Sequence, residues 1–99
     1  MYPSGNHITL SSLFYALSHP TRIMLLLQLI ENDEVPYNFL RYTGSKPNLS
    51  HHLKILKQTG LTYTRKEGVK RYIILRRNLI DDQFPGLLQI ILNNKDNIH

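Results

Sequence analysis

The sequence predicts one domain that is mainly α-helical and carries a single two-stranded β-hairpin. Apolar residues recur at helical spacing in several separate segments. Two short β-prone runs flank the tripeptide Glu67-Gly68-Val69, and positive charge is concentrated in the same part of the chain. At 99 residues the chain can form one hydrophobic core, and oligomerisation would help it to bury more surface.

Two helices are expected first, over about residues 9–17 and 20–31, after a flexible lead-in over 1–7. His19-Pro20 separates them, because a residue that precedes proline is disfavoured in the α region, and His19 is expected to be a capping or turn residue. The second helix is apolar nearly all round and is therefore the predicted central core helix. Its main buried face is expected to comprise Ile23, Leu26, Leu27 and Ile30.

Residues 35–43 are predicted to form a short extended entry and one or two helical turns that end at Gly44. A longer helix follows over 46–58, with Ser45 as its N-cap, Pro47 in its first turn and Gly60 at its end. Its apolar stripe comprises Leu49, Leu53 and Leu56. Its opposite face carries hydrogen-bonding side chains, namely Asn48, Ser50, His51, Lys54 and Gln58.

The predicted hairpin joins residues 61–66 to 70–75 through a tight reversal at Glu67-Gly68-Val69. Its tip is basic and contains Arg65, Lys66, Lys70 and Arg71. A last helix is expected to begin at the capping residue Asn78, and Pro85-Gly86 should kink it or split it in two.

The charge distribution favours a nucleic-acid partner. Residues 41–77 carry a net charge of +9, whereas the rest of the chain carries −4. The excess of cations lies in the same segment as the polar-faced helix and the hairpin, which is the asymmetry that a polyanion-binding face requires.

Several classes of protein are disfavoured. The chain contains no cysteine, which excludes disulfides, thiolate metal sites and cysteine nucleophiles. It has no phosphate-binding glycine loop, and no paired carboxylates stand beside a histidine, so we do not expect an enzyme. No apolar run reaches membrane-spanning length, so a cytoplasmic protein without a membrane partner is expected.

The predicted order of elements, α-α-α-α-β-β-α, is that of a winged helix-turn-helix. Such a fold places the second helix of the pair in the major groove of DNA, and the tip of the hairpin, or wing, reaches the flanking backbone or the minor groove. Hydrogen-bonding side chains can read base edges, and cations can bind phosphates. The predicted DNA-binding residues are Ser45, Lys46, Asn48, Ser50, His51, Lys54, Arg65, Lys66, Lys70 and Arg71, whereas His52 is expected to be structural.

Four motifs carry a resemblance to a known family: residues 16–22 (Ala-Leu-Ser-His-Pro-Thr-Arg), 47–57 (Pro-Asn-Leu-Ser-His-His-Leu-Lys-Ile-Leu-Lys), Gly60-Leu61 and 65–72 (Arg-Lys-Glu-Gly-Val-Lys-Arg-Tyr). In this order and spacing, over about residues 10–77, the chain resembles the ArsR/SmtB winged-helix repressors. The resemblance implies a homodimeric transcriptional regulator, built from one domain over residues 1–99, that binds a palindromic operator and often leaves it on binding an inducer.

The resemblance also implies that the first and last helices form the dimer interface. The residues expected there are Leu10, Leu13, Phe14, Leu17, Phe84, Leu87, Leu88 and Ile91. The alternative is that these residues only close the core of a monomer.

The metal sites that occur in the family lack their ligands in this sequence. Residues 35–38 (Val-Pro-Tyr-Asn) stand where the cysteine site would lie. On the last helix Asp81 matches the first ligand, but amides occupy the other approximate positions, Gln83, Asn94 and Asn97. An amide oxygen is a poor substitute for imidazole at a Zn²⁺-type site, so no metal or cofactor is expected.

Two alternatives to a repressor stay open at this point. The winged helix could serve as a protein–protein interaction module, although such helices usually expose apolar anchors. The protein could also activate transcription. The sequence does not identify the operator or an inducer.

Overall fold

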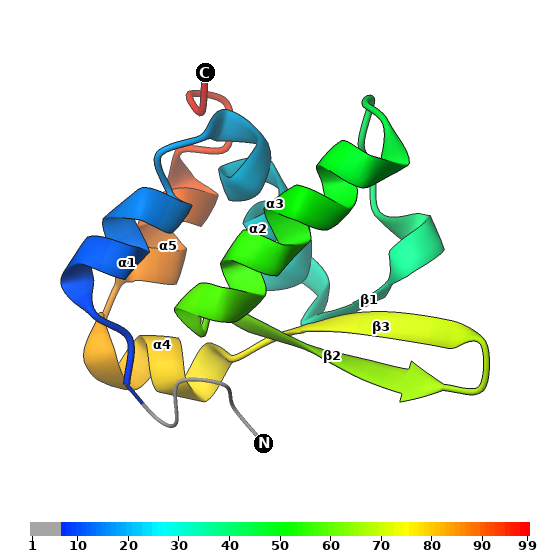
Figure 1. Ribbon diagram of the computed structural model, residues 1–99. Coiled ribbons are helices and arrows are strands. Elements are labelled where there is room, and N and C mark those ends of the chain that lie inside the picture. The colour runs from blue at the N-terminus through cyan, green and yellow to red at the C-terminus, as the bar shows by residue number, and fades with distance from the viewer. Residues whose placement is uncertain (1–6) are drawn as a thin grey trace.

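The computed structural model describes residues 7–99 and consists of helices around a small antiparallel sheet (Figure 1). The predicted lead-in over 1–7 falls, except for His7, outside the described residues. The elements in chain order are α1 (Leu10–Ala16), α2 (Pro20–Asn32), β1 (Glu34–Pro36), the 3₁₀ turn η1 (Tyr37–Phe39), α3 (Lys46–Thr59), β2 (Thr62–Glu67), β3 (Lys70–Leu75), α4 (Arg77–Gln83) and α5 (Leu87–Asn93).

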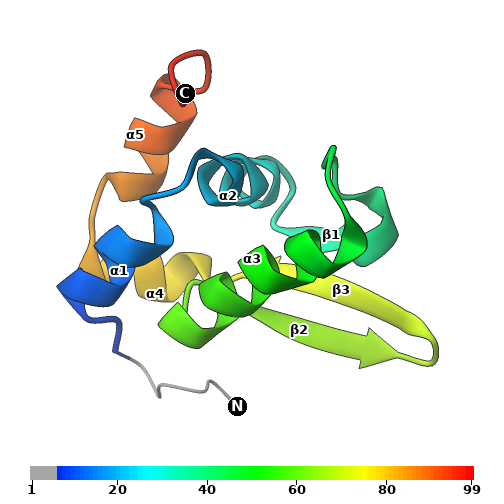
Figure 2. The same cartoon turned by 45° about the horizontal axis from the view of Figure 1, so that its top comes forward.

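The sheet has the strand order β1-β3-β2, with β3 in the centre and both pairs antiparallel. The predicted hairpin is confirmed, and Gly68, with a φ of 63°, begins its two-residue turn. Figures 1 and 2 show the hairpin projecting from the helices at one end of the molecule, while α1, α4 and α5 gather at the other end. The hairpin therefore lies beside α3, the helix that is predicted to enter the major groove. This is the arrangement of a winged helix-turn-helix.

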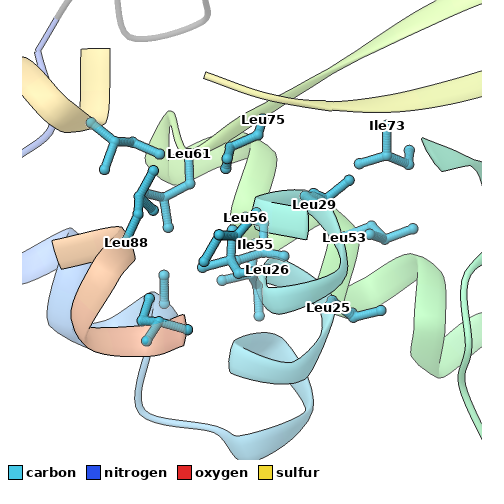
Figure 3. Close-up of a cluster of buried hydrophobic side chains, with 14 of the residues drawn as sticks. Leu25, Leu26, Leu29, Leu53, Ile55, Leu56, Leu61, Ile73, Leu75 and Leu88 are labelled. Atoms are coloured by element: carbon cyan, nitrogen blue, oxygen red, sulfur yellow. The ribbon is translucent and has the colours of Figure 1, made fainter. Parts of the chain in front are cut away.

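One core holds the described elements together, and α2 packs against α3, α5 and the sheet (Figure 3). The apolar stripe predicted for α3 is confirmed, because Leu49, Leu53 and Leu56 are buried. The face predicted for α2 is partly wrong, since Ile23 and Leu27 are only half-buried. Because α2 has neighbours on several sides, its buried residues instead extend over Arg22, Leu25, Leu26, Gln28, Leu29 and Ile30.

The predicted ends of α2 and α3 are confirmed. The His19 side chain accepts a hydrogen bond from the Thr21 N–H (3.1 Å) and caps α2, and the Ser45 hydroxyl accepts one from the Asn48 N–H (3.3 Å) and caps α3. Gly60 ends α3 in a left-handed conformation (φ 94°).

Two boundary predictions need correction. Only one 3₁₀ turn follows β1, and it ends at Phe39 rather than at Gly44, because the chain extends from Leu40 to reach the cap of α3. The prediction that Asn78 caps the last helix is wrong, because α4 begins at Arg77 directly after β3. The predicted break at Pro85-Gly86 is confirmed and separates α4 from α5.

Within residues 7–99 no single helix is long and apolar enough to cross a membrane. By length and composition, α1 and α2 meet that test together, but only as a pair bent by 99°.

Three arginine side chains donate to main-chain carbonyls at the C-terminal ends of α1, α2 and α3. Arg22 is 5% exposed and donates to Ala16 O (Nε, 2.7 Å) and Tyr15 O (Nη2, 3.0 Å) at the end of α1. Arg77 donates to Ile30 O (2.6 Å) in the last turn of α2, and the buried Arg76 donates to Gly60 O (3.1 Å) at the end of α3. These cations bind main-chain carbonyls at helix C-terminal ends, where the helix dipole favours positive charge.

We expect Arg22→Lys to lower the free energy of unfolding by about 2 kcal/mol, because an ammonium group cannot reach the acceptors that the guanidinium fork reaches. Urea denaturation would measure the change. Arg41→Lys is the matched control, since Arg41 is exposed and should tolerate the change without loss of stability. Equal stability of the wild type and Arg22→Lys would contradict the role assigned to Arg22.

Candidate nucleic-acid interface

The predicted DNA-contacting residues of α3 lie on its solvent side. Lys46, Asn48, Ser50, His51 and Lys54 are all exposed, while the apolar stripe faces the core. Asn48, Ser50 and His51 offer donors and acceptors of the kind that read base edges. Ser45 is exposed as well, and its hydroxyl is used as the helix cap.

A buried glutamine fixes the loop that leads into α3. The Gln28 side chain accepts a hydrogen bond from the Arg41 N–H (2.8 Å) and donates one to the Arg41 carbonyl oxygen (3.0 Å). A side-chain amide thus pairs with both backbone groups of one loop residue, as a neighbouring strand would. This clamp ties the start of α3 to the core helix α2.

The strand register distributes the predicted basic residues of the hairpin over its two faces. Lys66 lies opposite Arg71 and Arg65 opposite Tyr72, and residues directly opposite each other share a face. Arg71 lines a recess between the hairpin and α3 together with Ile73 and Lys54, so the face that carries Lys66 and Arg71 is the one toward α3. Two like charges directly opposite each other repel, and a bound anion between them would relieve that repulsion.

Arg65, which is also among the predicted DNA-binding residues, has partners within the chain. Its guanidinium forms ion pairs with Glu34 (3.0 Å) and Glu67, and it lies 4.4 Å over the Tyr72 ring. The hydrogen bonds that Arg65 donates to Glu34, and then to Glu67, raise the pKa of Arg65. Arg65 therefore holds the hairpin to β1 on the face away from α3, and its charge is balanced by carboxylates within the chain.

Other cations of the +9 segment also belong to the fold. Arg76 is buried, and Arg77 pairs with Asp33 (2.7 Å) as well as with the carbonyl of Ile30. The remaining cations are exposed, namely Arg41, Lys46, Lys54, Lys57, Lys66, Lys70 and Arg71. The positive surface is thus narrower than the composition suggests, and it follows α3 and the tip of the hairpin.

A groove of about 730 Å³ separates η1 and the start of α3 from the hairpin tip. We call it the η1 groove; its lining comprises Pro36, Tyr37, Asn38, Phe39, Lys46, Pro47, Ser50, Val69, Lys70, Arg71 and Tyr72. It brings together four predicted site residues from two elements: Lys46, Ser50, Lys70 and Arg71. Tyr37 and Phe39 also belong to this surface but were not predicted, because their only signal in the sequence is an aromatic pair after Pro36 that follows no helical stripe.

His52 lies on the inner flank of α3, as predicted for a structural residue. Its Nδ1 is 3.3 Å from Nη1 of Arg22, and its ring centroid is 4.6 Å from that of His19 and 5.9 Å from that of His51. Burial, followed by the neighbouring His19, Arg22 and His51, lowers the pKa of His52 below its usual 6.5. A neutral His52 can accept a hydrogen bond from Arg22, so α3 is joined to the α1–α2 corner.

The residues expected at a dimer interface divide into three groups by burial. Leu10 and Phe14 on α1 are 55% and 63% exposed, whereas Leu17, Phe84 and Leu87 are half-buried. Leu13, Leu88 and Ile91 lie in the chain's own core and leave little surface for a second copy. Ile90 on α5, which was not predicted at the interface, is 60% exposed.

The positions that correspond to the family's last-helix metal site serve other purposes. The Gln83 side chain accepts a hydrogen bond from the Ile8 N–H (2.7 Å) and donates one to the Ile8 carbonyl oxygen (3.0 Å). Asn94 donates to the carbonyl oxygen of Ile90 (2.8 Å). Over residues 7–99 no three His, Asp or Glu side chains lie close enough together to hold a metal ion.

Comparisons with known proteins agree with this geometry. A family model described as a helix-turn-helix domain matches residues 17–62. The chain is 33% identical over 89 residues to the transcriptional repressor SdpR of Bacillus subtilis, covering 89% of this chain and 98% of SdpR. It is 32% identical over 87 residues to an arsenical resistance operon repressor of Staphylococcus aureus (87% and 84% of the two chains). An uncharacterized HTH-type transcriptional regulator of Methanocaldococcus jannaschii is 30% identical over 83 residues (82% and 89%).

The lowered pKa of His52 predicts a pH-dependent stability. Because the folded chain disfavours protonated His52, the unfolded chain binds more protons just below pH 6.5, and stability should fall as the pH drops through this range. His52→Gln keeps an acceptor for Arg22 and removes the titration. We expect the difference in unfolding free energy between wild type and variant to be constant above pH 6.5. Below that pH the wild type should become progressively less stable relative to the variant.

Urea denaturation across this range would measure the difference. Parallel stability curves at all pH values would contradict the burial of a neutral His52.

Proposed function

Because the chain belongs to the ArsR/SmtB family of winged helix-turn-helix transcriptional regulators, we propose that it binds a palindromic operator as a homodimer and represses transcription. The observation that carries the proposal is the position of Asn48, Ser50 and His51 on the exposed side of α3, next to the cationic pair Lys66 and Arg71 of the hairpin. We place this activity in the cytoplasm, on double-stranded DNA.

In the proposed complex α3 lies in the major groove and reads base edges through Asn48, Ser50 and His51. Lys46, Lys54 and Lys57 bind the phosphates that border the groove, and Lys66, Lys70 and Arg71 bind the backbone on the side of the hairpin. Arg65 is left out of this set, because Glu34 and Glu67 hold it.

We propose that the two copies meet through the exposed apolar side chains of α1 and α5. Leu10 and Phe14 stand one helical turn apart on α1, and Ile90 is the most exposed apolar residue of α5. These elements lie at the opposite end of the molecule from the hairpin tip, so a partner seated there leaves the DNA-binding face open (Figures 1 and 2).

A winged helix that docks on another protein is the less well supported function. The exposed side of α3 carries amide, hydroxyl, imidazole and ammonium groups and lacks the apolar anchors that such interfaces use. The relatives are named as regulators and repressors, which favours DNA binding over catalysis.

Selection of bound sequences from a random pool of duplex DNA is the experiment that tests this function. We expect enrichment of a palindrome whose half-sites lie about one helical turn apart, since two α3 helices of a symmetric dimer would enter successive major grooves. No enrichment by the purified full chain would overturn the proposal.

The hairpin cations should contribute to binding without selecting a sequence. We expect the double variant Lys70→Ala, Arg71→Ala to weaken binding to the selected operator and to unrelated DNA alike. It should also reduce the slope of log K against log salt concentration by about 1.8, because each lost phosphate contact removes about 0.9. Fluorescence anisotropy titrations over a series of salt concentrations measure both quantities.

Arg65→Ala is the matched control in the same hairpin, and its salt slope should equal that of the wild type. Asn48→Ala should instead reduce the preference for the operator over unrelated DNA and leave the slope unchanged. Wild-type behaviour of the double variant at every salt concentration would refute the role of the hairpin.

The dimer surface can be tested by charge introduction. We expect Phe14→Asp to raise the dimer dissociation constant by about a hundredfold, because a carboxylate would be buried against a second copy. Analytical ultracentrifugation measures the shift, and binding to the palindrome should weaken with it, while binding to a single half-site does not. Met24→Asp, at an exposed position of α2, is the control that should stay dimeric.

A further inference from the structure

The η1 groove has a feature that phosphate binding alone does not explain. Its floor and rim are rich in aromatic and apolar groups, and two of them are strongly exposed: Phe39 on η1 (76%) and Val69 at the hairpin tip (fully). A surface that only has to bind phosphates needs cations and N–H groups. Phe39 and Val69 line the same groove, so the groove offers a partner apolar surface as well as cations.

The same groove is cationic. Lys46, Lys70 and Arg71 line it, and no aspartate or glutamate is among its lining residues. The groove is therefore lined by apolar and cationic groups together, and a DNA strand presents the complementary groups, namely the apolar faces of deoxyribose and the phosphates. The groove is also continuous with the predicted DNA-contacting side of α3 through Ser50 and Lys46.

Tyr37 joins the two sides of the groove. Its hydroxyl lies 3.3 Å from the Ser50 hydroxyl on α3, and the Arg71 guanidinium on β3 lies 4.2 Å from the centroid of its ring. A cation stacked on an aromatic face is held in place while its N–H groups stay free to bind an anion. Tyr37 thus sets the distance between the helix and the hairpin cation.

We infer that η1 is a third DNA-contacting element, and that the η1 groove seats the sugar–phosphate backbone of one strand. In this arrangement Phe39 packs against deoxyribose, and Lys46, Lys70 and Arg71 bind the adjoining phosphates. Tyr37 is a positioning residue that orients Arg71 toward the strand. The inference rests on the proposed DNA-binding function and adds to it a contact that is apolar.

The first test separates the apolar contact from the ionic ones. We expect Phe39→Ala to weaken binding of the full chain to the selected operator about fivefold to tenfold at every salt concentration, because it removes buried apolar area and no charge. The salt slope should therefore stay at its wild-type value. Met24→Ala, which truncates another exposed apolar side chain, is the control and should bind as the wild type does.

The second test is a double-mutant cycle on the positioning role. Arg71→Ala should reduce the salt slope by about 0.9, because it removes one phosphate contact. Tyr37→Leu removes no charge, yet it should reduce the slope by part of that amount. In the Arg71→Ala background, Tyr37→Leu should cost much less affinity than it does in the wild type. Tyr37→Phe keeps the ring under Arg71 and should retain the wild-type slope.

These outcomes distinguish the inference from the function on which it rests. If Phe39→Ala and Tyr37→Leu keep wild-type affinity and slope while Lys70→Ala, Arg71→Ala loses both, the η1 contact is refuted and DNA binding stands. If Tyr37→Leu lowers stability in urea but leaves the salt slope unchanged, its positioning role is refuted. If the wild type binds no duplex DNA, the proposed function fails and the inference fails with it.

Discussion

Hydrogen bonds from arginine to the open carbonyl ends of short helices are the interaction on which the rest of this structure depends. Helices of seven, thirteen and fourteen residues, as α1, α2 and α3 are, have little stability of their own, and each leaves carbonyl groups without partners at its end. Arg22, Arg77 and Arg76 bind carbonyls at these three ends from neighbouring segments. Each arginine therefore satisfies a helix and also fixes the position of that helix relative to another element.

This use of arginine separates the cations that build the fold from those that can meet a partner. In the sequence both kinds appear as one basic segment, yet Arg76 is buried and Arg65 and Arg77 are paired with carboxylates. The exposed lysines of α3 and the hairpin remain, together with Arg41 and Arg71. The same separation holds for histidine, because His51 faces solvent whereas His52 contacts Arg22 at the α1–α2 corner.

The sequence predicted those parts of the fold that depend on local chemistry. Ser45, Pro47 and Gly60 delimit α3, Gly68 permits the hairpin turn and Pro85-Gly86 separates the last two helices, because each residue acts on its own backbone. Features that depend on long-range contacts were not predictable. The pairing of Arg65 with Glu34, the burial of Leu13, Leu88 and Ile91, and the η1 groove all join segments that are distant in the sequence. Periodicity identifies an apolar face, but it does not say whether that face meets the same chain or a second copy.

The hydrogen bonds between the Gln83 side chain and the backbone of Ile8 restrict how this regulator could evolve into a metal sensor. Gln83 holds both backbone groups of Ile8, whose side chain is buried and lies against Gly60 at the end of α3. Replacing Gln83 with histidine would supply one imidazole and at the same time release the segment that covers this end of the core. The first substitution on that path would carry a loss of stability before any metal is bound, so the path requires a compensating change near Ile8 first. A side chain that has taken on a structural role thus limits which signals this chain can acquire by single substitutions.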